Sequence, residues 1–496
     1  MLRTLRYRRQ SCGQLRKYGK WAPAKELCSL TPAPDFAPLH ESPLLKPRTF
    51  RKDDRFLPPK EGIFLNPLAL KEIVLALCGL LMTGCGAGLS VYLHFFPQRR
   101  LFTALRRFLG GGRASDGKKV SSFGASAAAL AGSLGTGNIA GVAAALTAGG
   151  PGAVFWMWVS AFGGMALKYS EILLAAHGRR KGDSSGPMGY IARNVGPVAA
   201  WVFAFGCVGA SFGTGNMAQA NAAADALHTA FGLPKVICGL SLGLAALLVL
   251  RGGKGRVASA AGLLIPAVGG LYIAGAGAVL LLHLDRLPGA FCLVFSDAFS
   301  FQSVSGGVLG VFVSRAFRTG IARGVFTNEA GLGSAPIVHS AADSSSPADE
   351  GLWGVAEVAL DTLVMCTLTA AVLLVVPCPG ADGAAWTAAA FSSALGDWAG
   401  GFLGVSSALL AFASILTWHW CGEAALSYLG AGRRGLLFYR AAFFLAAVLG
   451  SVIPVQTVLS ISDLLNFFMA APNLLALFRA RKTVREETLV YISQKR

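Results

Sequence analysis

The residues best suited to binding a small polar solute lie in a glycine-rich stretch, GSLGTGNIAGVAAALTAGGPG, at 132–152. Seven glycines fall in these twenty-one residues, although the surrounding sequence is apolar and almost free of charge. Glycine costs about 1 kcal/mol relative to alanine in a helix interior. Backbone freed at membrane depth is tolerated only inside protein or along a cavity. The stretch therefore predicts a broken membrane helix whose ends bind a substrate and a cation.

The start of the second half-helix is the expected anion site. Backbone N–H groups at Gly135, Thr136 and Gly137 suit a carboxylate, because the positive end of the helix dipole points toward it. The glycines also fit two alternative roles. Gly135, Gly137 and Ala140 match a dinucleotide-binding fingerprint, which needs a preceding strand, but FGASAAALAGSL lacks β-branched residues. The second alternative is close helix packing through small residues, and it gives Asn138 no role.

Other polar and aromatic residues on apolar segments are candidates for the same site. Asn216 and Gln219 are three residues apart, so they share one helix face. They either line the pocket or form hydrogen bonds between helices. Trp418 lies one turn from Ser414, and it either forms a wall of the substrate site or packs in an aromatic core.

Ionisable residues within the apolar segments need partners, because a charge at mid-membrane costs about 2.5–3.5 kcal/mol on insertion scales. Lys168 and Glu171 are three residues apart and are expected to pair. Glu357 and Asp361 are one turn apart, so they either share a proton, which suits proton coupling, or lie in interior salt bridges or a wet cavity. Two further acids, Glu329 in TNEAGLG and Asp463, are interpreted as helix caps or anchors of a re-entrant loop.

The composition is that of a polytopic membrane protein. Hydrophobic residues make up 54% of the chain and charged residues 14%, and the mean hydropathy is +0.55. The net charge of +19 is concentrated in loops and tails, where the positive-inside rule accounts for it without a nucleic-acid partner. The ten cysteines form no C-x-x-C motif, so we expect small buried thiols and no metal cofactor.

Eleven segments are predicted to span the membrane. They cover about 67–96, 121–146, 152–176, 197–228, 235–250, 257–283, 303–322, 351–377, 402–428, 436–453 and 457–478. The stretch 324–341 is too polar and too kinked to span. We expect loops around Asp285 and at 378–401.

Charge then orients the chain in a plasma (inner) membrane. Placing the basic loop 97–120 inside also places five other basic clusters inside, at 179–193, 251–256, 315–323, 433–434 and 479–496. The C-terminus, with its basic tail 481–496, is therefore predicted to be cytoplasmic. Residues 1–60 carry 14 Lys/Arg against five acids and would lie outside. They fit a transit peptide, a disordered tail or an upstream untranslated stretch, and we expect them to be dispensable for insertion and transport.

The spans also suggest an internal repeat. Five begin at about 121 and five at about 303, and each set opens with a Gly/Ser-rich member, at 132–141 and 303–310. Interrupted segments at corresponding places in two halves are typical of inverted-repeat transporters. We therefore expect repeats at 121–283 and 303–478, with 67–96 as an extra N-terminal helix, in a transporter domain covering 67–480.

Several motifs together resemble the alanine/glycine:cation symporter family, the sodium:alanine symporters. They are GTGNIAGVAAALTAGGPGAVFWMW, GPMGYIARNVG, SFGTGNMAQAN, ARGVFTNEAGLGSAPIVH and DLLNFFMAAPNLLAL. The resemblance implies an all-α fold of the LeuT type. It also implies sodium-driven, sometimes proton-driven, uptake of small neutral amino acids such as alanine or glycine by alternating access, with sodium as coupling ion and no other cofactor.

The resemblance also implies a sodium site formed by oxygens. The carbonyls of Ala131, Leu134 and Leu410 and the hydroxyl of Ser414 would supply the ligands, although the Ser414 hydroxyl has its own i−4 carbonyl as an alternative partner. The substrate residues expected beside them are Gly135, Thr136, Gly137, Asn216, Gln219 and Trp418. The chain departs from the family pattern at Gly189, where a tyrosine is usual, and at Ala413 and Thr417, where a hydroxyl is respectively lost and gained.

Two other functional classes compete with a symporter. A membrane-embedded enzyme or redox subunit would need a ligand or catalytic constellation, and the histidines are scattered without such spacing. A channel or sensor derived from the same fold would share the spans and differ in its need for a cation gradient. We therefore predict a transporter and not an enzyme.

Overall fold

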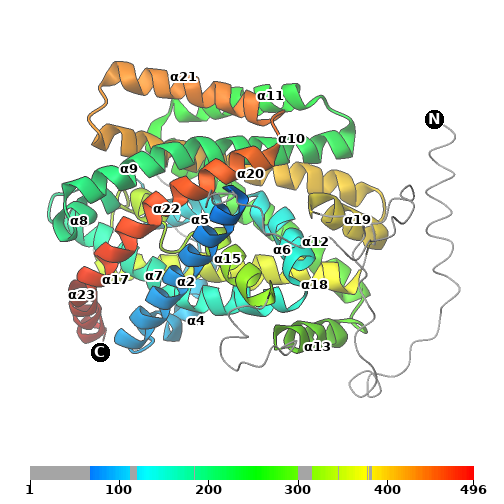
Figure 1. Cartoon of the computed structure of the whole chain (residues 1–496), viewed down its shortest axis with the longest axis horizontal. Helices are drawn as coiled ribbons and strands as arrows, with labels where there is room; N and C mark the ends of the chain where they lie inside the picture. Colours follow the sequence, from blue (N-terminus) through cyan, green and yellow to red (C-terminus); the bar gives the residue numbers. More distant parts are fainter. Residues whose placement is uncertain are drawn as a thin grey trace, which may run out of the picture. The chain divides into compact units, whose positions relative to one another are not determined.

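The computed structural model describes residues 67–111, 120–183, 185–299, 315–344, 346–376, 378 and 383–495. Helices dominate this part of the chain (Figure 1), and the only β-type pairing within it is an isolated bridge between Val120 and Ala342. The predicted all-α class is confirmed. The dinucleotide fingerprint is wrong, because a helix rather than a strand precedes Gly135.

Most predicted spans in the described ranges are covered by one or two helices. They are α2 (Pro67–Tyr92), α7 (Gly152–Arg180), α9 (Pro197–Phe212) with α10 (Ala218–Phe231), α11 (Lys235–Leu250), α12 (Gly253–Leu282), α17 (Pro347–Val358) with α18 (Thr367–Val375), α20 (Trp398–Tyr428), α21 (Arg433–Gly450) and α22 (Val455–Arg479). Within the described residues, five helical segments are long and apolar enough to cross a membrane, or six with one bent pair. The total of eleven stays a prediction.

The glycine-rich stretch is broken, as predicted. Helix α5 (Ser122–Ser133) ends there, the short turn η2 (Thr136–Asn138) follows, and α6 (Ala140–Gly149) begins after Ile139. The helical hydrogen-bond pattern is interrupted at Gly135. The Gly135 N–H donates to the Ser133 carbonyl at 2.8 Å instead of to the carbonyl of Ala131, four residues back. A second bend, of 120°, separates α6 from α7, at Gly150 with its φ of +77°.

Two further irregularities lie inside spans that the sequence presents as continuous. A π-helical turn, η3 (Gly213–Met217), joins α9 to α10, and another, η4 (Ala359–Cys366), joins α17 to α18. The η4 turn contacts η2 at the break. Such turns are rare and frequently mark functional sites.

Three stretches assigned to loops or tail are helical instead. The connections contain α13 (Leu287–Ala298) and α19 (Gly383–Leu395), and the basic tail forms α23 (Arg481–Gln494). Helix α23 packs against α7 and α17, and its buried Thr488 hydroxyl lies 2.8 Å from the Tyr169 hydroxyl. The hydropathy pattern identified only spans, so it missed short helices that are held by tertiary contacts.

The stretch 324–341 is kinked, as expected. Helix α15 (Arg315–Asn328) ends in a turn with positive φ at Glu329, Gly331 and Gly333, and α16 (Ser334–His339) follows. The smaller helices of the described chain are α3 (Phe96–Arg99), α4 (Leu101–Leu109) and α8 (Pro187–Asn194). The tail 1–60 and the Gly/Ser-rich segment 303–310 lie outside the described residues.

Two long helices organise the packing around the break. Helix α20 contacts α5, α9, α10 and α12, and α7 contacts α2, α15 and α17. Helices α11 and α21 lie alongside each other next to α10 (Figure 1). Through these contacts, α20 carries Ser414 and Trp418 to the end of α5, and α10 carries Gln219 to the same region.

Candidate functional site

The carbonyl end of α5 lies against two hydroxyls of α20. The Ser414 Oγ donates to the Ala131 carbonyl at 2.6 Å, and the Thr417 Oγ1 donates to the Ala128 carbonyl at 2.8 Å. Ser414 and Thr417 are buried. The Ala131 carbonyl is available because the break has removed its helical donor. The Ser414 hydroxyl therefore crosses to α5 rather than bonding to its own helix, which was the alternative.

The other two expected cation ligands lie on the same two elements. Leu134 directly follows α5, is buried, and departs from helical geometry at ψ 59°. Leu410 is buried on α20, one turn before Ser414. Carbonyl and hydroxyl oxygens are hard ligands of the kind that an alkali cation prefers. The end of α5 and the facing part of α20 therefore carry oxygens of the type that sodium binds.

Gln219 joins the broken segment to the η3 turn. Its Oε1 accepts hydrogen bonds from the Thr136 amide and from the Thr136 hydroxyl, each at 3.2 Å. Its Nε2 donates to the Thr214 carbonyl at 3.3 Å. A Cβ placed on Gly135 would lie only 2.6 Å from the Gln219 Oε1. Gly135 is therefore what allows this side chain to approach the break.

Gly137 faces open space, unlike Gly135. A Cβ placed on Gly137 would meet no heavy atom within 4 Å, and the same holds for Gly141 on α6. The space directly beside Gly137 is therefore unoccupied by protein atoms, next to the start of a new helical segment. This is where a carboxylate would meet backbone N–H groups and the positive end of a dipole.

Asn216 and Trp418 only partly follow the expectation for a substrate site. The Asn216 Nδ2 donates to the Phe443 carbonyl of α21 at 2.6 Å, so this amide joins helices, which was the second alternative. Its Oδ1 is buried with no partner in the described part of the chain. Trp418 is almost fully buried and packs against Gly215 in η3, where a side chain would overlap its ring.

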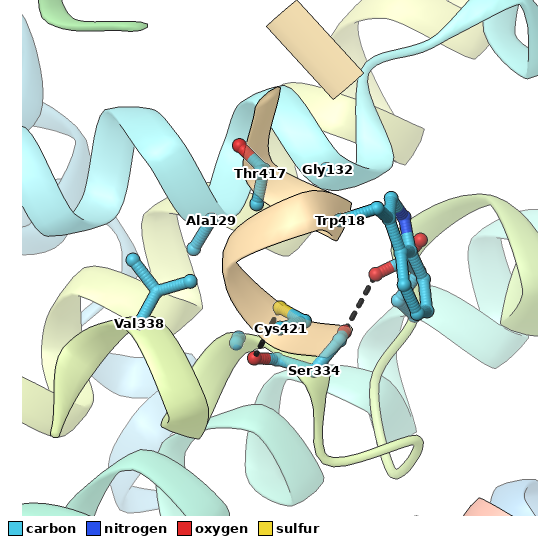
Figure 2. Close-up of a pocket in the computed structure, with 9 residues that line it drawn as sticks. Ala129, Gly132, Ser334, Val338, Thr417, Trp418 and Cys421 are labelled. Atoms are coloured by element: carbon cyan, nitrogen blue, oxygen red, sulfur yellow. Dashed lines mark hydrogen bonds between the residues drawn. The ribbon is translucent and has the colours of Figure 1, made fainter. Parts of the chain in front are cut away.

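A small cavity lies on the other side of Trp418, between α5, α16 and α20 (Figure 2). It is lined by Ala129, Gly132, Glu329, Ser334, Ala335, Val338, Thr417, Trp418 and Cys421. The Ser334 hydroxyl donates to the Glu329 Oε2 at 2.6 Å (Figure 2). Ser334 is the first residue of α16, so the interpretation of Glu329 as an anchor of the kinked segment agrees with this contact. Asp463 lies on α22.

A buried pair at the break was missed by the sequence analysis. The Asn138 Nδ2 donates to the Asp361 Oδ1 at 2.9 Å and to the Asp361 carbonyl at 3.1 Å. The Thr362 hydroxyl donates to the Asp361 Oδ2 at 2.9 Å. The Asn138 Oδ1 is buried without a partner among the described residues. The signal was a lone amide in the GTGN motif, which needs a polar partner from another span.

The pairing of Lys168 with Glu171, expected from their spacing, is wrong. Lys168 lies 3.5 Å from the Glu357 Oε2 of α17, whereas Glu171 accepts from the Asn473 amide at 2.9 Å. Glu357 and Asp361 have separate partners, so the shared proton gives way to the alternative of interior salt bridges and polar pairs. Spacing along one helix cannot show which neighbouring helix offers the better partner.

Comparison with known proteins identifies the family. The family model described as "Sodium:alanine symporter family" matches residues 66–496. An uncharacterized transporter of Haemophilus influenzae is 39% identical over 425 residues, covering 84% of this chain and 93% of that protein. The sodium/alanine symporter AgcS of Methanococcus maripaludis is 37% identical over 428 residues, covering 83% and 93%.

Two further similarities concern a curated relative and a solved structure. The probable sodium/glutamine symporter GlnT of Bacillus subtilis is 35% identical over 420 residues, covering 82% of this chain and 88% of that protein. Among solved structures, a Na⁺-coupled sialic acid symporter has a TM-score of 0.49 at 13% identity, covering 77% of this chain and 81% of that one. From the family match and the close relatives, the chain belongs to the sodium:alanine symporter family, and it is a multi-pass, cation-coupled amino-acid transporter rather than an enzyme.

Proposed function

We propose that this protein is a secondary active symporter that couples sodium influx to the uptake of alanine or glycine by alternating access. The observation that most directly supports this proposal is the contact between the Ser414 hydroxyl and the Ala131 carbonyl. These two oxygens lie 2.6 Å apart at the end of the broken helix, where Ala131 has lost its helical donor. Rotation of that hydroxyl would turn both oxygens toward one ion, with the carbonyls of Leu134 and Leu410 completing the site. The relatives' names, sodium/alanine and sodium/glutamine, support this ion.

The substrate carboxylate is proposed to bind the N–H groups at Gly135, Thr136 and Gly137, with the Gly135 N–H leaving the Ser133 carbonyl to which it donates in the empty protein. The open space beside Gly137 supports this position. Gln219, held at the Thr136 amide, would exchange that contact for one with the substrate. The unpartnered Oδ1 atoms of Asn138 and Asn216 are further acceptors, suited to the substrate ammonium. The role of Trp418 is then indirect, through its packing on Gly215.

The proposed arrangement in the membrane follows from charge and repeat. The protein would lie in the plasma membrane as eleven spans, with two inverted five-span repeats at 121–283 and 303–478 and the extra helix at 67–96. The C-terminal helix α23 would be cytoplasmic, because the basic clusters gather on that side. Lipid surrounds this domain, and the basic tail 1–60 is outside the proposed transporter domain of 67–480.

Purified protein in proteoliposomes tests the function directly. Sodium and proton gradients are imposed separately, and accumulation of labelled alanine and glycine is measured. We expect accumulation with an inward sodium gradient and none with a proton gradient alone. Accumulation driven only by protons would overturn sodium coupling. Downhill flux that ignores both gradients would indicate a channel, and chemical turnover of the solute would indicate an enzyme.

Replacing Gly135 by alanine is expected to weaken substrate affinity by about 2–12-fold. The methyl group would displace the flexible end of Gln219, which removes the hydrogen bond that this side chain is proposed to form with the substrate, a contribution of about 0.5–1.5 kcal/mol. The measurement is the alanine concentration dependence of sodium-driven uptake. Gly141→Ala is the matched control, because its methyl group enters open space. An unchanged affinity in Gly135→Ala would separate Gln219 from substrate binding.

A further inference from the structure

Four buried ionisable side chains from three helices meet beside α5. The His339 Nδ1 of α16 lies 2.7 Å from the Glu350 Oε1 of α17, and its Nε2 lies 2.8 Å from the Glu357 Oε1. Lys168 of α7 lies 3.5 Å from the Glu357 Oε2. Each of these four side chains is at most 1% exposed. None of them belongs to the cation or substrate groups at the break.

Helix α5 contributes two hydroxyls to this cluster. The Ser122 Oγ donates to the Glu350 Oε2 at 2.6 Å, and the Ser126 Oγ donates to the Glu357 Oε1 at 2.8 Å. The same helix carries Ala128 and Ala131, which contact α20, at its other end. One short helix therefore joins the cluster to the candidate cation site.

The two short contacts of the His339 ring can both be hydrogen bonds only if the cluster holds an extra proton. A neutral imidazole has one N–H donor, and its other nitrogen is only an acceptor. An ionised carboxylate is also only an acceptor. Both short contacts of His339, to Glu350 and to Glu357, can be hydrogen bonds only when the three groups hold one proton more than a neutral ring and two carboxylates. The serine hydroxyls and Lys168 do not lie between the ring and these oxygens, so they cannot supply it.

The charges of the four side chains also indicate that the cluster holds this extra proton. With it, the positive charges of Lys168 and His339 equal the negative charges of Glu350 and Glu357. Without it, one negative charge would be buried without compensation, which is unfavourable within a membrane protein. No group of three or more His, Cys, Asp or Glu within the described ranges can hold a metal ion that would replace the proton.

The charged groups on the surrounding helices contact partners outside this cluster. The contacts are Arg107 of α4 with Asp349, Arg179 of α7 with Asp343, Glu487 of α23 with His177 and Arg180, Glu171 of α7 with Asn473, Asp361 of η4 with Asn138, and Glu329 with Ser334. Helix α5 faces the cluster with Ser122 and Ser126, and the α20 residue bonded to α16 is Cys421, whose Sγ contacts the Ser334 carbonyl. Arg107 and Arg179 are paired with acids of their own, and Glu171, Asp361 and Glu329 accept hydrogen bonds from neutral groups, so none of these groups supplies a second positive charge to the four.

We propose that His339, Glu350 and Glu357 form a resident proton-binding site that fastens the start of α5 to α16 and α17. The proton is a structural ligand and not the coupling ion, because the cluster is separate from the groups at the break. Loss of this proton at alkaline pH removes one of the two hydrogen bonds between His339 and the glutamates and leaves a net negative charge, so the contact between α16 and α17 that holds the start of α5 is weakened. Transport then falls because the helix that carries the Ala131 carbonyl is no longer held.

Nitrogen-15 NMR of the full-length protein, labelled at histidine, tests the proton without any transported substrate. His339→Gln assigns the signal by its loss. We expect both ring nitrogens of His339 to be protonated at about pH 8, where free histidine, with a pKa of about 6.5, is mostly neutral. A single-protonated ring in the folded protein at that pH would overturn the proposal.

Glu350→Gln provides a second, stabilising variant that also assigns the signal if His339→Gln fails to fold. Its amide nitrogen can donate to the ring while its oxygen accepts from Ser122, so a neutral His339 satisfies every contact. The four positions then also balance, because only Lys168 and Glu357 are charged. We expect the doubly protonated ring to disappear in this variant. Its persistence in Glu350→Gln would contradict the hydrogen count.

The pH profile of sodium-driven uptake provides the functional readout, which depends on the proposed function. Wild-type uptake should fall at least about tenfold between about pH 7 and pH 10, and Glu350→Gln should change less than about threefold. Asp349→Asn, next to it but bonded to Arg107, is the matched control and should follow wild type. Parallel profiles for wild type and Glu350→Gln would refute the link to transport. Absent uptake at every pH would refute the proposed function, while the NMR result still decides the proton site.

Discussion

Replacing Gly137 by valine is expected to abolish amino-acid uptake while the protein remains folded in the membrane. A Cβ at this position meets no heavy atom within 4 Å, so the empty protein has room for the side chain. That room is where we place the substrate carboxylate. A branched side chain there would displace it from the N–H groups of the break. Each hydrogen bond to a charged group contributes about 1.5–3 kcal/mol, so losing two reduces affinity by at least about 100-fold.

The measurement for Gly137→Val is sodium-driven alanine uptake, normalised to folded protein from size-exclusion chromatography. Gly270→Val is the matched control, because it places the same side chain into open space in the middle of α12. We expect the control to transport normally. Near-normal uptake by Gly137→Val would show that residues 135–138 are not the substrate site.

Replacing Ser414 by alanine is expected to weaken sodium binding by about 5–150-fold. The change removes one oxygen ligand and leaves the Ala131 carbonyl without its donor, a loss of about 1–3 kcal/mol. The substrate contacts at Gln219 and Gly137 are untouched, so the apparent affinity for alanine should recover at high sodium. Uptake measured over a matrix of sodium and alanine concentrations separates the two effects.

Thr417 provides the control and a stricter test of the cation site. Its hydroxyl contacts the Ala128 carbonyl, one turn deeper in α5 than Ala131. Thr417→Val should therefore change the sodium dependence less than about threefold on its own. If Thr417 partly replaces the lost ligand, the combination with Ser414→Ala is worse than the sum of the single changes. An unchanged sodium dependence in the double variant would remove α20 from the cation site and move attention to Asp361.

The sequence identified the features that depend on a few neighbouring residues. Glycine and asparagine within an apolar stretch interrupt a helix locally, so the break at Gly135 was predictable. The kink in 324–341 follows the same logic, since Gly331 and Gly333 both have positive φ, whereas the positive φ of Glu329 was not predicted. The π turns at 213–217 and 359–366 were not predicted, because a slipped hydrogen-bond register changes no composition or period.

The candidate site was predictable in its members and less so in its contacts. Ser414 and Ala131 were placed together through the family resemblance, and the structure joins them at 2.6 Å. Gln219 and Asn216 were expected to share a helix face. Gln219 nevertheless accepts a hydrogen bond from Thr136, whereas Asn216 donates one to the Phe443 carbonyl. Neighbours on one face can contact different helices, because a few ångströms along the helix axis change the opposing surface.

By itself, therefore, the sequence determined the all-α membrane class, the positions of most long helices, the broken helix and the family. Tertiary structure alone decided which partner each buried polar group has. Lys168 forms an ion pair with Glu357 and not with Glu171, three residues away, and His339 lies between two glutamates that no spacing rule connects. The physical reason is the distance along the chain over which each interaction acts. Backbone propensity acts over one helical turn, whereas a buried charge takes whichever opposite group the packing of distant helices brings within reach.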